Sequence, residues 1–164
     1  MQPEFLDALL DACRLRGIHT IVDTSGHAPY EILDRIREKV DLFFYDLKLM
    51  DEDKHQEMTG VSNRLILDNL KKLAQSGSKI QIRIPLIPGV NTTPEEIAGM
   101  ADFISLLPGI NEISLLPYHN LGGQKYENLN RPLSHPQAQT PSEKDIKEIR
   151  SQLEAYGFEI RIGG

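Results

Sequence analysis

Two oppositely charged residues, Asp46 and Lys48, stand at the end of an apolar and aromatic stretch at 40–45. Such a stretch is typical of a buried strand, because aromatic side chains fit a pleated surface. Side chains two positions apart point to the same face of a strand, so Asp46 and Lys48 share one face. Structural ion pairs of this kind are common, so this pair alone does not identify a functional site.

Charged or ionisable residues also stand toward the C-terminal ends of three other predicted strands: Asp23, Arg83 and His119. Because the C-terminal ends of parallel strands meet at one edge of a sheet, we expect all five side chains to converge there. Arginine and lysine suit a carboxylate, and aspartate suits an amine or the hydroxyls of a ribose. The pattern therefore predicts a polar pocket for a zwitterionic ligand.

The segment 79–86 shows the clearest strand pattern, with apolar and polar residues in strict alternation. We expect the apolar set to pack on outer helices, which leaves Gln81 and Arg83 facing an inner lumen. The apolar set is Ile80, Ile82, Ile84 and Leu86, and the other set is Lys79, Gln81, Arg83 and Pro85.

Helices and strands alternate along the whole chain, at spacings that require crossover connections between parallel strands. Helix signals include the stop at Gly17, the caps at Asp51 and Thr93, and a capping box at 140–143. The expected strands are 18–22, 40–48, 79–86, 112–116 and 158–162. This order predicts an α/β fold, either an open doubly wound sheet or part of a (βα) barrel.

The chain length limits how much of a barrel can be present. A complete barrel needs roughly 200 residues or more, and this sequence offers about five βα units. It also opens on a helix with no strand before it, at Phe5 to Cys13. We therefore expect the 164 residues to form a single domain that lacks the first βα units of its fold.

Composition argues against several classes of function. The net charge of -6 argues against a basic nucleic-acid surface. No apolar run approaches membrane-spanning length, and no signal peptide opens the chain. The single cysteine, Cys13, allows no internal disulfide, so we expect a cytoplasmic protein with neither nucleic-acid nor membrane partners.

Taken together, these motifs resemble the glycyl-radical-enzyme activases of the radical S-adenosylmethionine superfamily, and most closely the pyruvate formate-lyase activating enzymes. The resemblance covers nearly the whole chain, in order and with compatible spacing. The matching stretches are His19-Thr20, Asp23-Thr24-Ser25-Gly26, Asp46-Leu47-Lys48, His55, Gly60-Val61-Ser62-Asn63, Ile82-Arg83, Pro88-Gly89, Leu115-Leu116-Pro117-Tyr118-His119, Leu121-Gly122, Lys125-Tyr126 and Tyr156-Gly157.

The resemblance implies a partial (βα)₆ barrel, in which an N-terminal Cys-x₃-Cys-x₂-Cys loop holds a 4Fe-4S cluster. In that family the cluster cleaves S-adenosylmethionine, and the resulting 5′-deoxyadenosyl radical takes a hydrogen from a glycine of the partner enzyme. It also implies a flavodoxin or ferredoxin-type reductant for the parent enzyme. By the same resemblance a monovalent cation lies near Asp23 and Asp46. The implied S-adenosylmethionine ligands are Asp23, Asp46, Lys48, Arg83 and His119, with Pro85, Leu116 and Tyr118 bordering the adenine.

The sequence departs from this family where the cluster is bound. It contains neither Cys-x₃-Cys-x₂-Cys nor a Gly-Gly-Glu-Pro segment, and Cys13 cannot replace three thiolates. We therefore expect the chain to be the C-terminal part of an activase, with no catalytic residues of its own and no activity alone. We also expect the open edge at 18–22, beside the first helix, to favour a homodimer.

Two other interpretations of the charged residues stay open. The chain could be a (βα)-barrel Schiff-base lyase with Lys48 as the nucleophile, activated by burial. It could also be a non-catalytic binding module that uses the pocket without chemistry. Trapping with borohydride and a carbonyl substrate would reveal the first, and titration with S-adenosylmethionine bears on the second.

We predict that the 164-residue chain, reconstituted with iron and sulfide, shows no 4Fe-4S absorbance, because Cys13 is its only cysteine. Visible absorption, followed by electron paramagnetic resonance after reduction, measures this directly. A stable, stoichiometric cluster would contradict the prediction.

Overall fold

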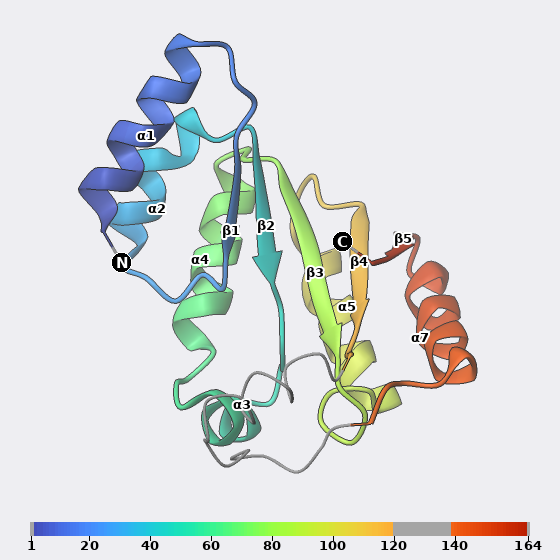
Figure 1. Cartoon of the computed structure of the whole chain (residues 1–164). Helices are drawn as coiled ribbons and strands as arrows, with labels where there is room; N and C mark the ends of the chain where they lie inside the picture. Colours follow the sequence, from blue (N-terminus) through green and yellow to red (C-terminus); the bar gives the residue numbers. More distant parts are fainter. Residues whose placement is uncertain (1, 120–138, 164) are drawn as a thin grey trace, which may run out of the picture.

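The computed structural model describes residues 2–119 and 139–163. Its centre is one parallel sheet of five strands, in the order β1-β2-β3-β4-β5 (Figure 1). Neighbours in the chain are therefore also neighbours in the sheet, as in successive units of a (βα) barrel. The strands are β1 Ile21–Thr24, β2 Leu42–Asp46, β3 Ile80–Leu86, β4 Glu112–Pro117 and β5 Glu159–Ile162.

Helices connect the strands, as the parallel order requires. Figure 1 shows α4 and α5 behind the sheet, with α1 and α2 beside β1 and α7 beside β5. The helices are α1 Pro3–Leu15, α2 Tyr30–Ile36 with the 3-10 turn η1 Arg37–Lys39, α3 Glu52–Thr59, α4 Arg64–Gln75, α5 Pro94–Ser105 and α7 Glu143–Ala155.

The alternation in β3 sorts its residues onto two different faces, as predicted. Ile82, Ile84 and Leu86 are fully buried against the helices, whereas Gln81 and Arg83 are only partly buried. The same holds in β2, where Phe43 and Tyr45 are buried on the helix side. One face of the sheet thus forms the core, and the other carries the polar side chains.

The first two strands differ most from the sequence prediction, and the other three differ by one residue each. β1 spans Ile21–Thr24 instead of 18–22, and β2 spans Leu42–Asp46 instead of 40–48. The Asp41 carboxylate accepts a hydrogen bond from the Thr20 amide at 2.7 Å, so this N–H is not available to the sheet. Hydrogen bonds from Thr20 also hold the pKa of Asp41 below its usual value. The Asp41 side chain therefore takes the place of a strand-to-strand hydrogen bond where the strands were expected to start.

The predicted helix caps at Asp51 and Thr93 are confirmed: each side chain accepts a hydrogen bond from the backbone three residues on. The last helix begins later than predicted. Its capping box is formed by Ser142 and Asp145, not by Thr140 and Glu143, and both reciprocal bonds are present. This choice leaves Pro141 outside the helix.

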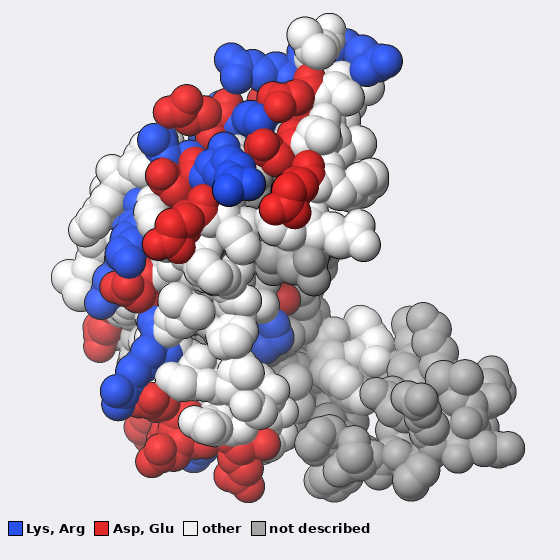
Figure 2. Space-filling view, turned by 90° about the vertical axis from the view of Figure 1, so that its left-hand side faces the viewer, with Lys and Arg blue, Asp and Glu red and all other residues white. Residues whose placement is uncertain are grey.

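The described surface carries charges of both signs. Figure 2 shows acidic and basic side chains interspersed over the upper part of the molecule. One example is Lys39, whose ammonium contacts the carboxylates of Asp7 and Asp11 at 2.6 and 2.7 Å. Within residues 2–119 and 139–163, no helix has the length and apolar character needed to cross a membrane.

Candidate functional site

Four of the predicted site residues form one ion-pair cluster on the inner face of the sheet. The Arg83 Nη2 lies 2.5 Å from Asp23 Oδ1 and 2.8 Å from Asp46 Oδ1. The Lys48 Nζ lies 3.2 Å from Asp46 Oδ2. Asp46 thus connects both cations, and Arg83 connects the two carboxylates. The cluster joins three neighbouring strands near their C-terminal ends.

Strand register explains how these side chains meet. Asp46 of β2 is directly opposite Arg83 of β3, and Asp23 of β1 is opposite Phe44 of β2. The Arg83 guanidinium lies over the Phe44 ring, 5.1 Å from its centre, and so reaches across β2 to Asp23. The phenyl ring supplies a flat apolar surface beneath the cation, a contact that sequence reasoning missed.

Burial and charge act against each other at Arg83, whose side chain is 15% exposed. Burial lowers the pKa of the guanidinium, but hydrogen bonds to Asp46 and Asp23 outweigh this effect and raise it. Arg83 therefore stays positively charged, and its hydrogen bonds to Asp46 and Asp23 fix its position. Lys48 and Asp23 are more exposed, at 36% and 58% of their side chains, and so offer one cation and one carboxylate to a ligand.

The remaining predicted residues lie on β4 and just beyond it. Pro85 and Leu116 are opposite each other in the β3–β4 register and are partly buried. Tyr118 continues the pairing, since its amide donates to the Leu86 carbonyl at 3.1 Å. His119 is exposed, and no hydrogen bond joins it to the ion-pair cluster within the described part of the chain.

Part of the sequence motifs falls outside the residues that the structure describes. Leu121, Gly122, Lys125 and Tyr126 lie outside the described residues. The cation expected near Asp23 and Asp46 stays a prediction. The described ranges contain no group of three or more histidine, cysteine, aspartate or glutamate side chains that could hold a metal.

The turn after β1 packs against residues on the helix side of the sheet, opposite the ion pairs. Gly26 has φ +73°, and a Cβ at this position would lie 1.7 Å from the Tyr45 hydroxyl and 2.2 Å from its ring carbon Cζ. Glycine is therefore required both for the backbone conformation and for space. Asn69 of α4 donates from Nδ2 to the carbonyls of Gly26 and Ala28, at 2.8 and 2.7 Å.

Tyr45 supports the same turn from within the core. Its hydroxyl donates to the Ile66 carbonyl of α4 at 2.7 Å, and burial raises the pKa of the phenol. Neither Tyr45 nor Asn69 was singled out from the sequence. The available signal was a polar residue at 69 inside the apolar face of a helix, beside Ile66, Leu70 and Leu73.

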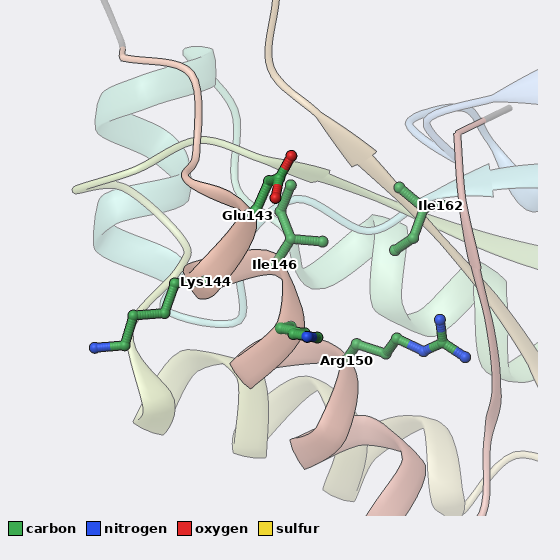
Figure 3. A pocket seen from close by; sticks show the side chains of 6 residues that line it. Glu143, Lys144, Ile146, Arg150 and Ile162 are labelled. Carbon is green, nitrogen blue, oxygen red and sulfur yellow. The ribbon is translucent and has the colours of Figure 1, made fainter.

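A groove elsewhere on the molecule is not this site. It lies between α7 and β5 and combines two isoleucines with charged side chains (Figure 3). None of the predicted site residues lines it. Its lining residues are Glu143, Lys144, Ile146, Lys147, Arg150 and Ile162.

No protein-family profile matches the sequence. Individual proteins of known function and known structure do match it. The trans-4-hydroxy-L-proline dehydratase activating enzyme of Clostridioides difficile is 44% identical over 163 residues, which cover 98% of this chain and 54% of that protein. The chain spans about half the length of the first curated relatives that it matches, 54% and 53%.

Two solved structures place the sheet in a known architecture. A domain of pyruvate-formate lyase-activating enzyme from Bacteroides vulgatus is 36% identical, with a TM-score of 0.85 over 99% of this chain and 92% of that one. A radical SAM methyltransferase from Sphaerobacter thermophilus is 18% identical, with a TM-score of 0.67 over 90% of this chain and 41% of that one. The second similarity concerns the fold alone. The predicted partial barrel is confirmed.

We predict that Gly26→Ala lowers the free energy of unfolding by about 2–5 kcal/mol, because it combines left-handed strain with a clash against Tyr45. Gly77→Ala is the matched control, since Gly77 has a similar φ of +78° but open space around it. The control should lose only about 1–2 kcal/mol. Equal losses in urea unfolding would show that the clash is relieved without cost.

Proposed function

Because the chain belongs to the glycyl-radical-enzyme activating enzymes of the radical S-adenosylmethionine superfamily, we propose that its ion-pair cluster binds S-adenosylmethionine. The observation that carries this proposal is the contact of Arg83 with both Asp23 and Asp46 at the C-terminal ends of the strands. In parallel α/β folds this edge is where ligands bind.

The available donors fit this ligand. Lys48 offers a cation to a carboxylate, and Asp23 offers an exposed oxygen to an amine or a ribose hydroxyl. Pro85 and Leu116 form an adjacent apolar surface for the adenine, with Tyr118 beside them. His119 follows the same strand and completes the proposed set. When bound, S-adenosylmethionine supplies the radical chemistry of the family, and the side chains of this chain bind and orient it.

The residues present do not fit a 4Fe-4S cluster. Cys13 is the only cysteine of the sequence and lies on α1, partly buried. We therefore propose that these residues alone do not catalyse the reaction and act as the S-adenosylmethionine-binding domain of an activating enzyme. A cytoplasmic location belongs to the same proposal.

For the whole protein we propose a glycyl radical enzyme as the partner and a flavodoxin or ferredoxin-type protein as the reductant. Enzymes of the pyruvate formate-lyase type are an example of this class. The relatives include activating enzymes for a dehydratase and for choline trimethylamine-lyase, so similarity alone does not select the partner. Similarity to these relatives also argues against a Schiff-base lyase that uses Lys48 as its nucleophile, because the relatives are activating enzymes.

We predict that the chain binds S-adenosylmethionine in titration calorimetry and that Asp46→Ala weakens binding at least tenfold, because Arg83 and Lys48 lose their shared partner. Lys144→Ala is the control, since Lys144 lines the groove by α7 and is remote from the cluster in the chain. Wild-type protein that gives no heat of binding at millimolar ligand would refute the proposal for this chain.

We also propose that the open edge at β1 pairs two copies of the chain. Apolar side chains are exposed there on α1 and before β1: Phe5 is 65%, Leu9 46% and Ile18 51% exposed. β1 is an edge strand, and unpaired edge groups favour association with another strand. A two-fold axis gives the simplest closed assembly.

We predict that light scattering at micromolar concentration detects a dimer and that Phe5→Lys shifts it toward the monomer. The charged side chain would have to be buried in the contact. Leu106→Lys is the matched control, because Leu106 is 81% exposed at the end of α5. A monomeric wild-type protein would refute the dimer proposal and would not affect the proposal of an S-adenosylmethionine site.

A further inference from the structure

Three asparagines are buried beneath the edge of the sheet where the ion-pair cluster lies. Asn63, Asn69 and Asn91 are 3%, 0% and 1% exposed. Asn63 and Asn69 belong to the N-cap and the body of α4, Asn91 lies between β3 and α5, and each donates both amide hydrogens to backbone carbonyls near the C-terminal ends of the strands. We infer that these asparagines are positioning residues, which hold the strand ends and the turns after them in the geometry that a ligand meets.

The contacts follow the order of the strands. Asn69 donates to Gly26 and Ala28, in the turn after β1. Asn63 donates to the carbonyls of Leu49 and Met50 after β2, at 3.0 and 2.8 Å.

Asn91 connects two strands at once. It donates to the Lys48 carbonyl at 2.9 Å and to the Pro85 carbonyl at 2.6 Å. Its own oxygen accepts from the Ile87 amide at 2.8 Å, so all of its polar atoms are used. The end of β2 is thereby tied to β3, and the loop after β3 is tied to both.

Backbone chemistry explains why side chains are needed here. β2 leaves the sheet after Asp46, whereas β3 continues to Leu86, so carbonyls beyond the last pair lack a strand partner. A buried carbonyl without a hydrogen bond is destabilising. The asparagine amide carries two donors and fits between two carbonyls.

Pro85 marks the point where the sheet opens. Arg83 accepts from Leu47 on the β2 side, and Leu86 accepts from Tyr118 on the β4 side. Alternate residues of β3 therefore turn their backbone groups toward opposite neighbours, and those of Pro85 face β2. Proline has no N–H to leave unpaired at this place, and its carbonyl is taken by Asn91.

This arrangement acts on the proposed site through the backbone. Lys48 is itself one of the residues held by Asn91, and Asp23 lies three residues before the turn held by Asn69. Loosening these carbonyls would displace the cation and the carboxylate that face the ligand. The inference thus rests on the proposed function for its purpose, but its structural effect can be measured without ligand.

The experiment compares hydrogen exchange in the ligand-free protein and in two variants, Asn69→Leu and Asn91→Leu. Leucine keeps the approximate volume and removes the donors. Asn69→Leu should speed exchange about tenfold in 24–28 and leave 47–50 unchanged, and Asn91→Leu should do the reverse. Asn111→Leu is the matched control at an exposed asparagine and should change neither segment.

Affinity for S-adenosylmethionine then tests the positioning role. We expect Asn91→Leu to weaken binding about tenfold. Leu153→Ala, which empties a buried position in α7, should lower stability and change affinity less than twofold. Exchange that rises equally in all segments, or Asn91→Leu protein that binds like wild type, overturns the inference. If wild type itself binds no S-adenosylmethionine, the proposed function fails, and the segment-specific exchange still decides whether the asparagines hold these turns.

Discussion

The Arg83 guanidinium sets the main constraint on the inner face of the sheet. A cation with 15% exposure needs partners, and the strand register supplies them from β2 and, across β2, from β1. Asp46 is directly opposite, and Asp23 is reached across the ring of Phe44. Removing either carboxylate would leave a partly buried charge underpaired, so the cluster behaves as a unit. Lys48 and Asp23 are the more exposed members of the cluster.

The second constraint is the division of the sheet into two unlike faces. Ile82, Ile84 and Leu86 are fully buried against the helices, and this apolar packing aligns the strands. Polar residues of the same strands are thereby directed to the opposite face. A shift of one residue in register would exchange the two sets, so packing of the core also protects the geometry of the ion pairs.

The strand ends require a third kind of interaction. Parallel strands of unequal length leave carbonyls without partners, and Asn63, Asn69 and Asn91 supply the missing donors from below. Gly26 allows the turn after β1 to lie against Tyr45. The polar edge of the sheet thus depends on buried side chains as well as on the ion-pair cluster.

The sequence by itself was sufficient to predict the parallel α/β fold, the apolar face of β3 that packs on the helices, and the convergence of Asp23, Asp46, Lys48 and Arg83. Period-two alternation and local caps are encoded by neighbouring residues, so they can be read without coordinates. Only the tertiary structure decided where β1 begins, because the Asp41 side chain takes the Thr20 amide across 21 positions. It alone showed that one guanidinium joins Asp23 and Asp46, and that three buried asparagines donate to backbone carbonyls after the strands. These contacts join segments far apart in the chain, and no local pattern specifies which distant carbonyl a buried amide will meet.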